Sequence, residues 1–264
     1  MNSIIGIVGG VGPKAGLRFH QLIIDGTNVI QADQGHVPVM HFSFSNLIPD
    51  RTQFLLGKQK INPARPAAHI VSQMANAMPE GFNHMLVGIP CNTFHAPAIF
   101  DVFQDLVRPL EPQVDVVHML ETTFDHLADK YPQVQRVGIL TTTGTRMAGH
   151  IRKGLEKNGL TVIEVPLQDQ PFLHDCIYHP IWGIKSTAFF SEQACLGIMS
   201  LTDKLLQRGA EIVILGCSEL PLVMEEIRPH MVPFIDPVEV LAEHLLAQIA
   251  PLHPARLKKE FVHY

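Results

Sequence analysis

The feature that most constrains the fold is a regular alternation between short apolar, β-branched runs and longer segments with helical periodicity. The runs that predict strands are residues 4–8, 37–43, 85–89, 115–118, 136–140, 161–165, 211–215 and 232–235. The segments that predict helices are residues 13–29, 64–77, 94–106, 122–130, 146–158, 192–208 and 237–249. Alternation of this kind predicts an α/β fold with parallel sheets.

The pattern also occurs twice. Residues 4–8 and 136–140 are similar in type, and each run enters a loop of small residues followed by a helix. In both halves a later apolar strand ends at a cysteine, Cys91 or Cys217. We therefore predict two similar Rossmann-like lobes facing each other across a central cleft. The first lobe would comprise residues 1–116, joined by the C-terminal segment 236–264, and the second lobe residues 117–235.

Composition excludes several classes of protein. The chain has 264 residues, 46% of them hydrophobic, and a net charge of −5 without a basic run, so neither disorder nor a nucleic-acid partner is expected. No stretch approaches the roughly 18 apolar residues of a membrane span, and the first residues do not resemble a signal peptide. We expect a cytoplasmic protein whose four cysteines are reduced thiols.

A metal site is not expected. The cysteines form no CxxC pair, and the 15 histidines are scattered along the chain. His95 follows Cys91 by four residues, a spacing that suits metal ligation on one helix. However, Cys91 is predicted to lie in the loop before that helix, so the two side chains would not share a face.

Cys91 and Cys217 are the candidate catalytic residues, because ligands of α/β sheets bind at the carboxyl ends of strands. A buried cysteine is most often a small apolar filler, but matched positions in two halves favour a shared function. Polar neighbours, Asn92 and Thr93 or Ser218 and Glu219, can hold a thiolate. Two facing thiols suit inversion of a stereocentre, whereas nucleophilic catalysis needs only one.

Several motifs resemble those of one enzyme family. Residues 89–95 (IPCNTFH) and 215–221 (LGCSELP) are similar to the two cysteine motifs of the aspartate/glutamate racemases. Residues 9–13 (GGVGP) resemble that family's opening loop, and residues 143–145 (TGT) its second-lobe loop. The resemblance implies a racemase without pyridoxal phosphate that acts as a homodimer. The lack of a ligand cluster and of a ribose-binding acid predicts that it needs neither a metal nor another organic cofactor. The second cysteine favours racemisation over the related single-cysteine decarboxylases.

The resemblance also assigns substrate-binding residues. Arg51 lies in a segment similar to the family's substrate-binding stretch, and Lys185 resembles a second-lobe lysine that meets a substrate carboxylate. Two cations fit a small dicarboxylic amino acid. The resemblance at Glu219, where glutamate racemases more often have a histidine, implies aspartate rather than glutamate. The other expected substrate-binding residues are Gly10, Asn92, Thr93, Thr143, Gly144, Thr145, Ser218 and Glu219. We also expect the lobes to close over the substrate, with hinges near residues 115–120 and 234–237.

Three alternatives remain open at this point. Residues 10–15 fit the G-x-G-x-x-A dinucleotide fingerprint, which would indicate a nucleotide-dependent oxidoreductase. The acidic residue expected at the end of the second strand is missing, because Asp33 precedes that strand and Asn46 follows it. We therefore interpret the loop as a carboxylate cradle at a helix N-terminus. The second alternative is a glutamate or broad-specificity racemase, and the third is a non-catalytic carboxylate-binding protein.

Overall fold

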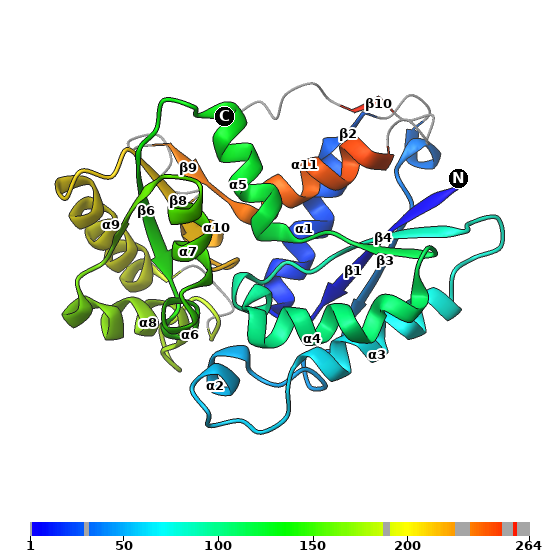
Figure 1. Cartoon of the computed structure of the whole chain (residues 1–264), viewed down its shortest axis with the longest axis horizontal. Helices are drawn as coiled ribbons and strands as arrows, with labels where there is room; N and C mark the ends of the chain where they lie inside the picture. Colours follow the sequence, from blue (N-terminus) through cyan, green and yellow to red (C-terminus); the bar gives the residue numbers. More distant parts are fainter. Residues whose placement is uncertain (1, 29–31, 187–190, 225–232, 250–255, 258–264) are drawn as a thin grey trace.

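A computed structural model describes residues 2–28, 32–186, 191–224, 233–249 and 256–257. It contains two four-stranded parallel sheets, which lie side by side along the long axis of the molecule (Figure 1). The first sheet has the order β3-β1-β4-β5, with β1 (Ser3–Gly9), β3 (Val39–Ser43), β4 (His84–Gly88) and β5 (Val114–Val116). The second has the order β7-β6-β8-β9, with β6 (Arg136–Thr141), β7 (Thr161–Glu164), β8 (Ile212–Gly216) and β9 (Phe234–Ile235). The predicted α/β class with two parallel-sheet lobes is confirmed.

The two sheets repeat the same topology. In each, the first strand lies between the second and the third, and the fourth pairs with the third. Strands β4 and β8 are therefore equivalent, and Cys91 and Cys217 follow them at the carboxyl end. The internal repetition seen in the sequence thus places one thiol at the same point of each sheet.

In the described part of the chain, helices cover the sheets in three layers, and the buried apolar side chains form three hydrophobic cores. The outer face of the first sheet is covered by α3 (Ala64–Asn76) and α4 (Pro97–Val107), and that of the second by α8 (Gln170–Tyr178) and α9 (Glu192–Gln207). Between the sheets, a single core joins residues of β1, β6 and β8 to the helices of the middle layer. These helices are α1 (Pro13–Gly26), α5 (Met119–Lys130), α7 (His150–Lys157) and α11 (Pro237–Ile249). The two lobes are therefore joined by shared apolar packing.

The chain crosses between the sheets twice. It leaves the first sheet after β5 and reaches β6 through α5, and it returns after β9 into α11, which packs against α1 and α5. At the second crossing, the buried Asp236 carboxylate pairs with Arg18 of α1 and accepts a 2.9 Å hydrogen bond from the Val238 amide. The exact lobe boundaries and the hinge motion remain predictions.

Some elements differ from the sequence prediction. The helix predicted to end near residue 158 is two helices, α6 (Thr143–Ala148) and α7, because Gly149 between them adopts a left-handed φ of 67°. The first helix ends at Gly26, and β2 (Thr27–Asn28) follows, paired with β10 (Arg256–Leu257). Residues 29 and 232, the predicted ends of two elements, lie outside the described residues.

Several short elements were not predicted at all. The three α-helices among them are α2 (Arg51–Leu55), α8 and α10 (Pro221–Met224). The 3-10 turns are η1 (Ala32–Gly35), η2 (Asn92–His95), η3 (Arg108–Leu110) and η4 (Leu167–Asp169). None of the helices in the described part of the chain is long and apolar enough to cross a membrane.

Candidate active site

Both candidate cysteines line one small cavity between the lobes. Cys91 and Cys217 are each 5% exposed, and the cavity has a volume of about 10 Å³, room for a single water at most. The first lobe contributes Arg51, Cys91, Asn92 and Thr93, and the second contributes Thr142, Tyr178, Lys185, Cys217, Ser218 and Glu219. The repeated fold thus brings the two thiols to the same cavity from opposite lobes.

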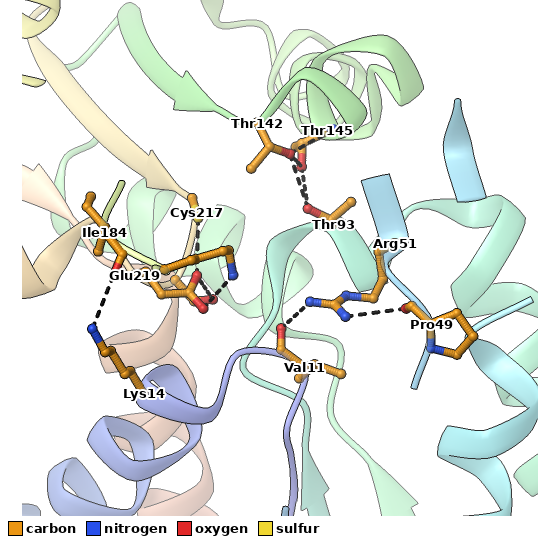
Figure 2. Close-up of polar contacts among 12 residues, drawn as sticks. Val11, Lys14, Pro49, Arg51, Thr93, Thr142, Thr145, Ile184, Cys217 and Glu219 are labelled. Carbon is orange, nitrogen blue, oxygen red and sulfur yellow. Dashed lines mark hydrogen bonds and ion pairs between the residues drawn. The ribbon is translucent and has the colours of Figure 1, made fainter. Parts of the chain in front are cut away.

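On the first-lobe side, Arg51 lies beside Cys91. It is the first residue of α2, whose N-cap Asp50 accepts a 2.7 Å hydrogen bond from the Gln53 amide. The guanidinium donates to the Val11 and Pro49 carbonyls at 2.5 and 3.3 Å (Figure 2). Burial alone would lower the pKa of Arg51. The interaction of the guanidinium with Cys91 helps to raise that pKa above the ordinary value for arginine. Arg51 is therefore a fixed positive charge next to a thiol.

The Asn92 side chain is available to a ligand. It is 1% exposed, and neither its amide nitrogen nor its amide oxygen has a hydrogen-bond partner among the described residues. A buried amide without partners costs stability, so such a group in a cavity indicates a site for a bound molecule. The Nε of Arg51 is also buried without a partner in the part of the chain described.

On the second-lobe side, Glu219 joins Cys217 to Lys185. The Cys217 thiol donates to Glu219 Oε2 at 3.3 Å, and Lys185 Nζ donates to Glu219 Oε1 at 2.6 Å (Figure 2). Burial would raise the pKa of Glu219, but Lys185 lowers it overall, so the carboxylate is charged. Burial first, and then the charge of Glu219, raise the pKa of Cys217. Cys217 is therefore a protonated thiol in this arrangement.

Tyr178 completes the second-lobe wall. The Lys185 ammonium lies 5.3 Å from the centre of its ring, within the range of a cation–π contact. Burial raises the pKa of the Tyr178 hydroxyl, which therefore remains protonated. Tyr178 was missed from the sequence because its helix, α8, was not predicted.

A second, outer cavity adjoins the first. It has a volume of about 200 Å³ and shares Arg51, Lys185 and Glu219 with the inner cavity. Its other lining residues are Gly10, Gly12, Pro13, Lys14 and Asp50. Gly12 is required there, because its φ is 154° and a Cβ would collide with the Glu219 carboxylate. The charged side chains thus separate the thiols from the outer cavity.

The predicted loop at residues 143–145 contributes less directly. The Thr145 hydroxyl lies 2.8 Å from that of Thr93, across the boundary between the lobes. Gly144 packs against α2, where a Cβ would come within 2.8 Å of Thr52 Cα. Thr143, Gly144 and Thr145 line neither cavity. Thr142, which was not predicted, lines the inner one, and its hydroxyl lies 3.4 Å from that of Thr93 (Figure 2).

His95 supports the Cys91 loop. Its Nδ1 donates to the Cys91 carbonyl at 2.9 Å, and its Nε2 accepts from the Met119 amide at 3.3 Å. Burial lowers the pKa of His95 well below its ordinary value, so the ring is neutral. Within the described ranges, no group of three or more His, Cys, Asp and Glu side chains is placed to hold a metal ion.

These features define a class: two α/β lobes of one topology, each supplying a thiol to a shared, charged cavity. Comparison with known proteins identifies the family. Residues 8–245 match the model of the Asp/Glu/Hydantoin racemase family. The chain belongs to this family, and the resemblance drawn from its motifs is confirmed.

Individual relatives share part of the sequence or the fold. An uncharacterised protein of Pectobacterium carotovorum subsp. carotovorum is 30% identical over 140 residues, which cover 53% of this chain and 87% of the relative. Aspartate racemase of Picrophilus torridus has a similar structure, with a TM-score of 0.77 and 22% identity over 97% of this chain and 96% of that one. Glutamate racemase of Francisella tularensis has a TM-score of 0.61 and 17% identity, over 94% and 81%. At these identities the solved structures show a shared fold.

Proposed function

We propose that this chain racemises a small acidic amino acid, with aspartate favoured, using Cys91 and Cys217 as acid and base without an organic cofactor. The observation that carries the proposal is the single cavity lined by both thiols and by two cations. Family membership supports catalysis over a nucleotide-dependent oxidoreductase or a non-catalytic carboxylate-binding protein.

The charges of the cavity complement such a substrate. A dicarboxylic amino acid carries two carboxylates and one ammonium, and the cavity offers Arg51, Lys185 and Glu219. Glutamate carries the same charges, so charge alone selects the class. The aspartate racemase among the similar structures supports aspartate. The resemblance of the motif around Glu219 to that of aspartate racemases supports it as well. A glutamate or broad-specificity racemase is the alternative.

The proposed reaction moves one proton off the α-carbon and another onto it. A thiolate on one face takes the α-proton, and a thiol on the other face delivers its own proton, so the enzyme's net charge is unchanged. Arg51 would stabilise the negative charge that develops at the substrate carboxylate. Because Cys217 is held as a thiol, we assign Cys91 as the base of the resting enzyme. The two roles are exchanged after each turnover.

The test uses single enantiomers of aspartate and glutamate in deuterated water, without added cofactor, and follows chirality by chromatography and α-exchange by NMR. The wild-type chain should interconvert the enantiomers. Cys91→Ala and Cys217→Ala should each abolish interconversion, because one face then lacks its proton carrier. Each variant should exchange the α-proton of one enantiomer only, and the two variants should choose opposite enantiomers.

Cys176→Ala and Cys195→Ala are the matched controls. Both residues are buried in the outer core of the second lobe and line neither cavity, so their variants should turn over normally. Substantial racemisation by either Cys91→Ala or Cys217→Ala would refute the two-thiol mechanism. Exchange of the same enantiomer by both would refute the opposite-face arrangement.

A further inference from the structure

We infer that His150 is a positioning residue that fixes the Cys91 loop when the two lobes are together, and that it does so only as a neutral imidazole. The inference rests on the proposed function. His150 is the first residue of α7 in the second lobe, and its Nε2 lies 3.0 Å from the Asn92 carbonyl in the first lobe. A carbonyl can only accept, so Nε2 carries the hydrogen and donates it.

Two successive carbonyls of the Cys91 loop are held by imidazoles, but in different ways. His95 holds the Cys91 carbonyl from within the same lobe. His150 holds the next carbonyl, that of Asn92, from the opposite lobe. Separation of the lobes would therefore break the second bond and leave the first intact. The bond at the backbone of Asn92 also leaves its buried side-chain amide for the substrate.

The surroundings of His150 require the neutral form. Its Nδ1 is buried and has no hydrogen-bond partner among the described residues, so a proton there would be a buried charged donor without an acceptor. The titratable groups that act on it, His95 and His118, are themselves imidazoles with lowered pKa values and offer no negative charge. Burial and His118 lower the pKa of His150 to about 4, against the bond to Asn92.

Lobe closure is therefore linked to a proton. When the lobes are apart, the His150 imidazole is hydrated and titrates near its ordinary pKa of 6.5. Closing the lobes below that pH requires loss of this proton, so closure becomes less favourable as the pH falls, and the change approaches about tenfold for each pH unit well below 6.5. The pKa values of the thiols and of the substrate contribute to the same profile, which is why a matched variant is needed.

The kinetic test compares wild-type protein with His150→Gln, whose amide N–H can reach the Asn92 carbonyl without titrating, and with His150→Leu, which has no donor. At pH 8 the kcat/KM of His150→Gln for aspartate should stay near that of wild type, and that of His150→Leu should fall about tenfold. From pH 6.5 to 5.5, the ratio of His150→Gln to wild type should rise about fivefold, because the neutral fraction of an open-state imidazole with a pKa of 6.5 falls from about one half to about one eleventh, while thiol and substrate titrations cancel in the ratio. A ratio that is independent of pH, or equal losses in both variants, would overturn the inference.

A second measurement does not depend on activity. Iodoacetamide alkylation of Cys91 at pH 8, read by peptide mass spectrometry with Cys176 as an internal reference, reports opening of the Cys91 loop. His150→Leu should be alkylated several-fold faster than wild type, and His150→Gln at about the wild-type rate. Equal rates in wild type and His150→Leu would overturn the inference even if the chain racemises aspartate. The expected difference in rates, without any racemisation, would instead refute the proposed function and leave the role of His150 standing.

Discussion

At the scale of single residues, Glu219 links the charge of the site to the protonation of one thiol. Its carboxylate accepts from Lys185 and from Cys217, and it lies against the backbone of Gly12 in the opposite lobe. The negative charge that stabilises Lys185 also opposes ionisation of Cys217. One side chain thus holds the cation in place and keeps the neighbouring thiol protonated.

Removing the charge of Glu219 should make Cys217 more acidic. In Glu219→Gln, the thiol loses the carboxylate that raises its pKa and keeps Lys185, which lowers it. The pH midpoint for alkylation of Cys217 should therefore move down relative to wild type, while racemisation slows because the thiol no longer holds its proton. The measurement is the alkylation rate of the Cys217 peptide across pH. An unchanged or higher midpoint would contradict this account.

The ion pair between Lys185 and Glu219 should also stabilise the folded chain. Glu219→Ala leaves Lys185 as a buried, unpaired charge, and we expect a loss of about 3 kcal/mol in the free energy of unfolding. Replacing both residues by methionine should restore part of that loss, because no isolated charge remains. Urea denaturation of wild type, Glu219→Ala and the double methionine variant at pH 7 measures both the loss and its partial recovery. Equal stability of the single and double variants would mean that the pair is not a buried ion pair.

The loss of unfolding free energy in Glu219→Ala should become smaller as the pH falls. The pKa of Glu219 is lowered in the folded chain, so its contribution is present above the unfolded carboxyl pKa of about 4.3. The contribution disappears as the pH falls through the lowered folded value, where the carboxylate is protonated. The stability difference between wild type and Glu219→Ala should therefore shrink in strongly acidic solution.

At the scale of secondary-structure elements, the boundary between the lobes near the site depends on the contact between α2 and α6. Gly144 lies on α6, and an added Cβ would come within 2.8 Å of the Thr52 backbone on α2. Backbone cannot move aside as a flexible side chain can, so the helices must separate. Helix α2 carries Arg51, which lines the inner cavity, and α6 carries Thr145, whose hydroxyl lies 2.8 Å from that of Thr93.

Gly144→Ala should therefore reduce both stability and activity. Overpacking of this kind costs about 1–3 kcal/mol, and displacement of α2 moves Arg51 away from Cys91. Gly159→Ala is the control, because its φ of 79° gives a strain of about 1 kcal/mol whereas no atom lies within 4 Å of the added Cβ. Thermal unfolding and racemisation assays should find both variants destabilised, with turnover reduced only in Gly144→Ala. Normal turnover in Gly144→Ala would show that this contact does not position the site.

The elements also show where prediction from the sequence ends. Strands β1, β4, β6 and β8 were predictable because parallel strands buried on both faces are continuous apolar runs. The break between α6 and α7 was not predictable, because the helical pattern of apolar residues continues across Gly149. His150 is the first residue after that break. Helix α8 was not predicted, and Tyr178 at its end was therefore not recognised as a residue of the site.

The site itself was predictable in part. The repeated pattern identified Cys91 and Cys217 as equivalent, and the family resemblance added Arg51 and Lys185, all of which line the inner cavity. Contacts such as those of Gly12 with Glu219 join residues far apart in the chain, and no local pattern encodes them.

At the scale of the whole molecule, the two lobes share a helical layer, and the cavity between the thiols is nearly closed. A volume of about 10 Å³ cannot hold an amino acid, so the proposed substrate would require the lobes to be further apart when it enters. The crossings between the sheets, near Val117 and Asp236, are where the chain would bend. Closure would then exclude water and strengthen the charges around the reacting atoms.

Binding of a dicarboxylate should therefore make the protein more compact. Small-angle X-ray scattering with and without succinate, a dicarboxylate that lacks the α-ammonium group and has no stereocentre to invert, measures the radius of gyration. We expect a decrease on binding, and Arg51→Ala, which lacks the carboxylate partner, should not respond. The same samples report whether the chain forms the predicted homodimer. Identical dimensions with and without bound ligand would contradict closure.

The unequal surroundings of the two thiols have a kinetic consequence. Mirror-image solutes have the same free energy in water, so the equilibrium constant of a racemisation is one and kcat/KM must be equal in both directions. The individual kcat and KM values are not bound by that equality. Cys91 has a guanidinium beside it and Cys217 has a carboxylate, so the two protonation forms of the free enzyme differ in energy. One enantiomer should therefore have a higher kcat than its mirror image, and its KM should be higher by the same factor.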